Sequence, residues 1–139
     1  MTTTEPEAGL VELFSKEWCV KAVEIWNEVV IPNLADPPNY NYVVEWIDLD
    51  ADATCQLKAQ TGLIVSWEPG KVIPDEDCDF ILAAKRENWR KIGEGTLDPV
   101  GAVASKRVHL RKGPMAVVIK EADAFKRLLV AYGRIPTAW

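Results

Sequence analysis

The chain has 139 residues, of which 48% are hydrophobic and 27% are charged, and this is the composition of a globular protein. We expect one domain over 1–139, with a disordered tail over 1–8. Its 16 basic and 21 acidic side chains give a net charge of -5, which disfavours partners such as nucleic acid and nonspecific attraction to anionic membranes. No apolar run reaches the roughly 18 residues of a transmembrane helix, and the first residues lack a secretory pattern, so we expect a cytoplasmic protein.

The first predicted element is an amphipathic helix. Apolar residues recur every three or four positions from Val11 to Val29, which is the spacing of one helix face. Pro32 ends this helix, because proline removes a backbone donor and restricts the residue before it. The following stretch, 33–41, contains two more prolines and is predicted to be a loop.

Four strands are predicted next, because short segments rich in β-branched and aromatic residues alternate with polar turns. Their ranges are 42–50, 54–59, 62–68 and 79–84. The first three follow one another so closely that antiparallel hairpins are expected.

Short helices and one more strand complete the sheet. A helix is predicted over 85–92, and a second begins at Asp98 and Pro99, since aspartate caps helices and proline suits the first helical position. Val108 and Leu110 then alternate with polar residues, which predicts a fifth strand over 108–110.

The last predicted element is a helix from Met115 to Tyr132, whose apolar residues are spaced three and four apart. Gly133 follows it and is expected to end it in a left-handed conformation.

Little in the chain suggests catalysis. The single histidine, His109, stands between basic residues on the polar side of its strand, which is typical of a solvated side chain. A lone histidine does not build a usual zinc site. The three cysteines are too few and too dispersed for a disulfide framework, so buried free thiols are expected.

Some acidic residues are candidate sites. Asp48, Asp50 and Asp52 have the spacing of a calcium loop, but the glycine and the final glutamate of that loop are missing. Glu45 lies in an apolar strand, where it is an edge residue, one partner of an ion pair, or a buried general base with a raised pKa. A small enzyme using Glu45 or Asp79 as base is therefore a minor alternative.

Tryptophan is unusually frequent, with six residues beside three tyrosines and three phenylalanines. An indole supplies a large apolar surface and one donor. Core packing and the lining of a pocket are both consistent with this composition.

The segment from Trp67 to Tyr132 resembles the sterol carrier protein type 2 domains, a family of small lipid-binding and lipid-transfer modules. The resemblance rests on an ordered set of residues: Asp79, Phe80, Ile81, Trp89, Ile92, Gly95, Leu97, Asp98, Pro99, Ala102, Lys106, Val108, Leu110 and Gly113. The predicted order of helices and strands agrees with that family as well.

This resemblance implies an α+β fold in which helices cover a five-stranded, mainly antiparallel sheet, with an apolar tunnel between the layers. The tunnel would hold a fatty acyl, acyl-CoA or sterol-like ligand without a cofactor, a metal or a catalytic residue. The implied lining residues are Phe80, Leu82, Trp89, Leu97, Val100, Val103, Met115 and Val118, with Trp46 and Trp67 as further candidates.

Arg107 and Arg111 belong to a basic stretch that either contacts a lipid headgroup or forms a solvated strand face. The predicted protein is an intracellular lipid carrier, monomeric or homodimeric, with transient contact to a membrane or an enzyme. The alternative is the same fold with a closed core, acting as an interaction or dimerisation module of an enzyme complex.

Overall fold

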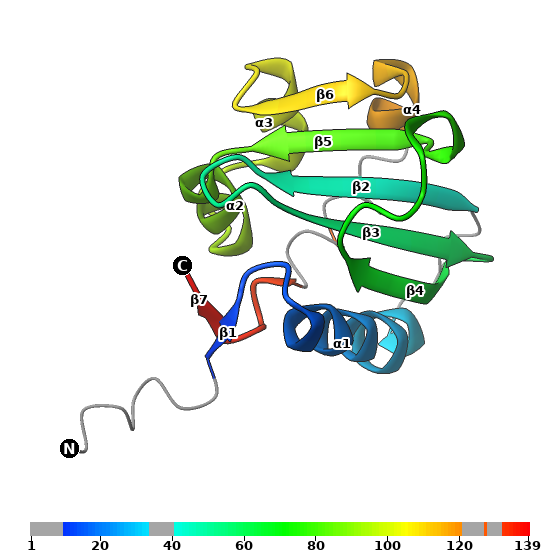
Figure 1. The fold of residues 1–139 in the computed structure, drawn as a ribbon, viewed down its shortest axis with the longest axis vertical. Helices are drawn as coiled ribbons and strands as arrows, with labels where there is room; N and C mark the ends of the chain where they lie inside the picture. The colour runs from blue at the N-terminus through cyan, green and yellow to red at the C-terminus, as the bar shows by residue number, and fades with distance from the viewer. Residues whose placement is uncertain (1–9, 34–40, 121–126, 128–131) are drawn as a thin grey trace.

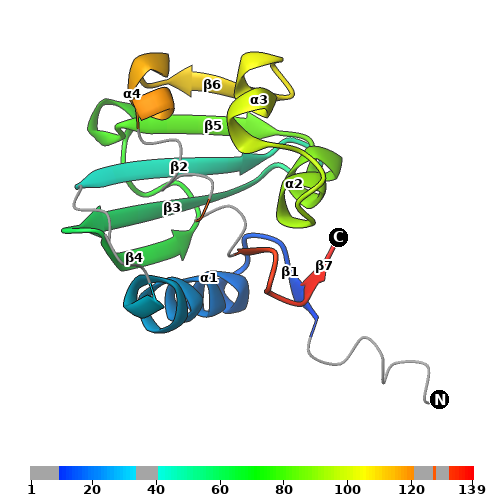
Figure 2. The same cartoon turned by 180° about the vertical axis from the view of Figure 1, so that it is seen from behind.

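A five-stranded sheet organises the protein, as a computed structural model shows. The structure describes residues 10–33, 41–120, 127 and 132–139. Short helices lie over one face of the sheet, which we call the inner face, and a long connection crosses the opposite, outer face (Figures 1 and 2). The ends of the described chain, near residues 11 and 138, lie side by side.

The sheet has the strand order β4-β3-β2-β5-β6. Neighbouring strands are antiparallel except β2 and β5, which run parallel. This confirms the predicted α+β class and the five-stranded, mainly antiparallel sheet, and each boundary lies within two residues of its predicted position. The strands are β2 (Tyr42–Asp48), β3 (Ala53–Gln60), β4 (Leu63–Pro69), β5 (Phe80–Ala84) and β6 (Val108–Lys112).

The N-terminal helix begins later than predicted. Phe14 has a φ of 63°, which is incompatible with a right-handed helix, and Ser15 caps the helix by accepting a hydrogen bond from the Trp18 amide at 3.2 Å. The residues before this cap instead form a short strand that pairs in parallel with β7 (Thr137–Ala138). The observed series is β1 (Val11–Glu12), α1 (Lys16–Glu24), the π-helical η2 (Ile25–Val30) and the 3-10 helix η3 (Ile31–Asn33).

The remaining helices are short: η4 (Asp75–Asp77), α2 (Arg86–Gly93), α3 (Pro99–Ala104) and α4 (Met115–Lys120). As predicted, Asp98 caps α3, because its carboxylate accepts a hydrogen bond from the Gly101 amide at 2.8 Å. Several expectations lie outside the described residues, namely the tail over 1–8, most of the loop over 33–41 and most of the closing helix beyond residue 120.

Gly133 has a different role from the predicted one. The φ angle of Gly133 is not positive, so the residue does not adopt the expected left-handed conformation. A Cβ at this position would lie 1.9 Å from the carbonyl oxygen of Gly93. Glycine is therefore needed because the C-terminal segment touches α2 backbone to backbone.

The core contains a closed ring of five aromatic side chains, all exposed by 3% or less. Successive ring centroids are separated by 5.2 Å (Phe14–Trp18), 5.3 Å (Trp18–Trp67), 5.8 Å (Trp67–Trp46), 5.7 Å (Trp46–Trp89) and 5.8 Å (Trp89–Phe14). We call this group the aromatic ring cluster. It joins the segment after β1, the strands β2 and β4 and the helices α1 and α2, so it ties the N-terminal part of the protein to the inner face.

Tyr132 supports this cluster through its hydroxyl, which donates to the carbonyl oxygen of Trp89 in buried surroundings. Burial raises the pKa of this phenol well above its ordinary value. The folded state therefore holds the proton more tightly than the unfolded chain does. The contribution to stability is complete below about pH 10 and is lost as the pH rises through the folded-state pKa.

Tyr132→Phe is accordingly expected to lower the free energy of unfolding by about 1 kcal/mol at pH 7, through the lost hydrogen bond. Above about pH 10 the variant should lose stability less steeply than the parent, because it carries no phenol to ionise. Urea unfolding between neutral and alkaline pH measures both effects. Equal alkaline slopes for the two proteins would contradict this prediction.

Candidate functional site

The predicted lining residues are mostly buried. Seven of the ten are exposed by 8% or less, namely Phe80, Leu82, Trp89, Val103, Val118, Trp46 and Trp67. The other three, Leu97, Val100 and Met115, are half-buried. The strand residues among them share the inner face, because Trp46 is the register partner of Leu82 and Val44 is that of Phe80.

The aromatic ring cluster takes up three of these ten residues, Trp46, Trp67 and Trp89. Each indole contacts two other rings of the cluster, which is core packing. Trp89 also donates its indole N–H to the carbonyl oxygen of Ile47 at 2.9 Å. Around these three indoles, aromatic rings therefore fill the interior.

Phe80 lies at the other end of β5, away from the indoles. Its ring stands 5.3 Å from that of Tyr42, and it packs so closely on Gly113 that a Cβ there would come within 2.3 Å of it. Gly113 closely precedes α4, whose first residue, Met115, packs against the core. The structure thus places two predicted lining residues, Phe80 and Met115, close to Gly113.

The two arginines predicted for a headgroup are not brought together. Arg107 lies in the exposed turn before β6, with its amide bonded to the carbonyl oxygen of Ala102. Arg111 lies near the far end of β6 and lines a cavity with Glu45, on the outer face. A ligand on the inner face and Arg111 are therefore on opposite sides of the sheet.

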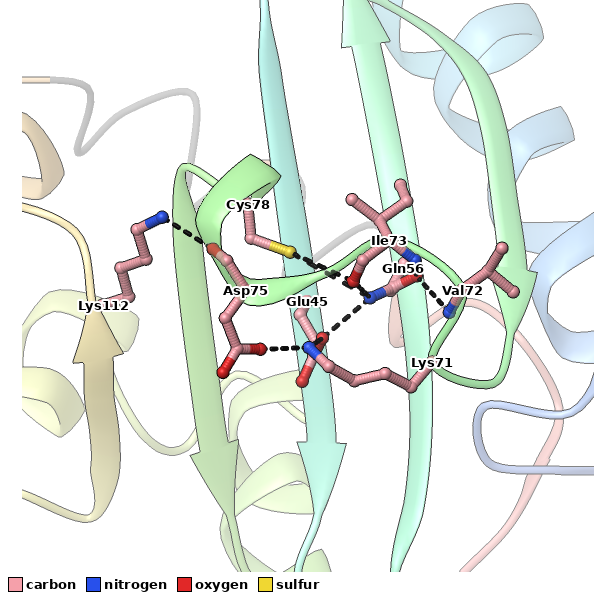
Figure 3. Close-up of polar contacts among 8 residues, drawn as sticks. All are labelled: Glu45, Gln56, Lys71, Val72, Ile73, Asp75, Cys78 and Lys112. Carbon is pink, nitrogen blue, oxygen red and sulfur yellow. Dashed lines mark hydrogen bonds and ion pairs between the residues drawn. The ribbon is translucent and has the colours of Figure 1, made fainter.

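Glu45 forms a buried polar network on this outer face (Figure 3). Its side chain is 4% exposed and lies 2.5 Å from the Lys71 ammonium. Gln56 donates to the same carboxylate at 2.8 Å, while its amide oxygen accepts from the backbone of Val72 and Ile73. Glu45 is therefore one partner of an ion pair, on the central strand β2 and not at a sheet edge.

Hydrogen bonds within this network shift the pKa values of Lys71 and Asp75 in the directions that favour their charged forms. Partial burial alone would lower the pKa of Lys71, but hydrogen bonds to Asp75 and Glu45 raise it above its ordinary value. The bond from Lys71 lowers the pKa of Asp75 in turn. The ammonium stands between the two carboxylates in Figure 3. The sequence did not reveal this partner, because Lys71 lies in a connection, 26 positions from Glu45.

Two other acidic candidates, Asp48 and Asp79, serve structural contacts. Asp48, fully buried, pairs with Arg86 at 2.8 Å, and Asp79 accepts a hydrogen bond from the Val43 amide at 2.7 Å. Among the described residues, no group of three or more histidine, cysteine, aspartate or glutamate side chains is placed to hold a metal. The three cysteines are buried and free, and burial raises the pKa of Cys55 and of Cys78.

Comparison with known proteins identifies the fold. No protein-family model and no curated protein matches the sequence. A crystal structure of sterol carrier protein 2 matches 89% of this chain and 99% of its own, with a TM-score of 0.74 and 20% identity. A conserved hypothetical protein from Thermus thermophilus, described as possibly a sterol carrier protein, covers 92% of each chain, with a TM-score of 0.72 and 18% identity.

A more distant match is palmitated SCP2L2 from Aedes aegypti, with a TM-score of 0.53 and 16% identity over 76% of this chain and 92% of its own. A sec-alkyl sulfatase matches 61% of this chain but only 12% of its own, with a TM-score of 0.50. The chain therefore has the fold of sterol carrier protein 2 and SCP2-like proteins. None of the helices in the described part is long and apolar enough to cross a membrane.

Proposed function

We propose that this chain, whose fold is that of sterol carrier protein 2, is a non-catalytic lipid carrier that encloses a fatty acyl, acyl-CoA or sterol-like ligand at the inner face. The observation that carries the proposal is the fold match over about nine tenths of the chain. The palmitated relative adds support for an acyl ligand. Each buried methylene contributes about 0.8 kcal/mol, so an acyl chain can bind without a charged anchor.

The ligand is proposed to lie toward α4 rather than among the indoles. The aromatic ring cluster fills the core at Trp46, Trp67 and Trp89, so these residues would form an end wall. The remaining seven predicted residues would line the ligand, namely Phe80, Leu82, Leu97, Val100, Val103, Met115 and Val118. Arg107, in the turn between α3 and β6, is the proposed headgroup contact at the α3 end of this lining. Arg111 lines the cavity on the outer face instead.

Native mass spectrometry of freshly purified protein tests the proposal. A second mass that matches a lipid and disappears on denaturation is expected. Met115→Trp, which puts a large side chain at a half-buried lining position, should weaken binding of a fluorescent fatty acid about tenfold. Ile119→Trp on the same helix is the control, because Ile119 is 58% exposed. Absence of both the adduct and the fluorescence response would refute the carrier.

A closed-core interaction module is the second candidate, and the aromatic packing favours it. Its contact surface would lie outside the core, and Leu63 and Val65 on the edge strand β4 are 44% and 53% exposed. A stable dimer in sedimentation experiments that is indifferent to lipid would support this function. A lipid-responsive monomer would exclude it.

A further inference from the structure

The outer face carries a cavity of about 360 Å³ that the lipid-carrier function does not use. This volume is at the lower end of the range of about 300–1,000 Å³ found for small-molecule pockets. Ile47 and Ile81, on neighbouring strands, supply apolar surface beneath it. The charged lining residues are Glu45, Lys71, Asp75, Arg111 and Lys112.

A β-bulge explains why two consecutive cations line this cavity. Leu82 pairs with Leu110 but Ile81 pairs with Lys112, so Arg111 is an extra residue in β6. A bulge interrupts the alternation of side chains between the two faces. Arg111 and Lys112 consequently line the same cavity, although they are adjacent in sequence.

The charges within the cavity do not cancel. Lys71 pairs with both carboxylates, Glu45 and Asp75. The Lys112 ammonium donates to the backbone carbonyl oxygen of Asp75, at 2.6 Å. Within the described part of the chain, the side chain of Arg111 has no hydrogen bond or ion pair. Three cations and two carboxylates thus line the cavity, which leaves one positive charge in excess, and neither Arg111 nor Lys112 forms an ion pair with a carboxylate of the described residues.

We propose that this outer cavity binds a small organic anion. Its oxyanion group, a carboxylate or a phosphate monoester, would be held by Arg111 and Lys112, and a short apolar body would rest on Ile47 and Ile81. A guanidinium presents paired donors that match the geometry of either oxyanion. The site is separate from lipid carriage, because the whole thickness of the sheet lies between them.

Titration of the ¹⁵N-labelled full chain with benzoate and with phenyl phosphate tests this site. Saturable shifts are expected at the amides of Lys71, Arg111 and Gly113 with at least one of the two probes. Arg111→Gln and Lys112→Gln should each weaken binding about tenfold, as loss of a charged hydrogen bond predicts. Lys58→Gln is the matched control, since Lys58 is exposed on β3 two residues from Gln56, outside the cavity lining.

Several results would overturn the proposal. No saturable shift up to about 10 mM of either probe would show that the cavity binds no such anion. Shifts that persist unchanged in Arg111→Gln would place the anion elsewhere. Cosedimentation with vesicles containing phosphatidic acid that depends on Arg111, without any response to phenyl phosphate, would assign the cations to a membrane surface instead. Lipid adducts in native mass spectrometry are independent of all three results.

Discussion

Arg86→Gln is expected to lower the free energy of unfolding by about 3 kcal/mol, because it leaves a carboxylate buried without its partner. Asp48 has a fully buried side chain, and Arg86 reaches the same carboxylate oxygen with Nε and Nη2, each at 2.8 Å. Arg86 also pairs with Glu12 of β1 at 3.1 Å. Urea unfolding at neutral pH measures the loss.

Two further variants separate this buried pair from ordinary surface charges. Asp48→Asn in the Arg86→Gln background should recover more than half of the loss, because a neutral amide costs less to bury than an unpaired carboxylate. Arg90→Gln, on the exposed side of the same helix, breaks a pair with Glu94 and should cost less than about 0.5 kcal/mol. If Arg86→Gln costs no more than Arg90→Gln, the carboxylate of Asp48 is not buried as described.

Trp89→Ala should lower the free energy of unfolding by about 4 kcal/mol. Trp89 is fully buried, closes the aromatic ring cluster between Phe14 and Trp46, and bonds the carbonyl oxygen of Ile47. The variant removes the ring contacts of the indole with Phe14 and Trp46, and it removes the hydrogen bond to the carbonyl oxygen of Ile47. Thermal and urea unfolding should agree in showing this loss.

Trp139→Ala is the comparison for that experiment. Trp139 is half-buried and packs on the edge of the core, so its removal should cost about 1 kcal/mol. Similar losses for the two variants would mean that Trp89 is not tightly packed. The space around the indoles would then be available to a ligand, contrary to the end wall described above.

Local chemistry was enough to predict most of the sheet and its connections. The alternation of Val108 and Leu110 with polar residues located β6, and Asp98 with Pro99 located the start of α3. These patterns depend on residues that are close in sequence, so they can be recognised without knowledge of the tertiary structure. The all-buried strand β5 was recognisable for the same reason, as a short apolar run between turns.

Features that depend on distant partners were beyond the sequence. Val11 shares the apolar spacing of α1 and is buried, yet it belongs to β1, because its partner is Thr137 at the other end of the chain. The periodicity of a buried side chain does not distinguish these two states. In the same way, no residue near Glu45 in the sequence indicates that Lys71 is its partner.

The residue types of the candidate site could be predicted from the sequence, but the positions of individual side chains could not. Phe80 and Leu82 of β5 lie on the same face as Trp46, but composition could not decide which tryptophans pack on one another. Arg111 was expected beside a lipid headgroup from its charge alone. Alternation with Leu110 turns Arg111 to the outer face, and the bulge in β6, which leaves no mark in the residue types of that strand, brings Lys112 beside it.

The pairing of β1 with β7 has a mechanical consequence. The two strands run in the same direction, and the Val11 amide also donates to the carbonyl oxygen of Pro136 at 2.8 Å. Tension applied between these two segments would load their hydrogen bonds in shear, so that they resist together instead of opening one by one. Separation of β7 would also break the hydrogen bond from the Trp18 indole to the Thr137 hydroxyl, so it would disturb the aromatic ring cluster as well.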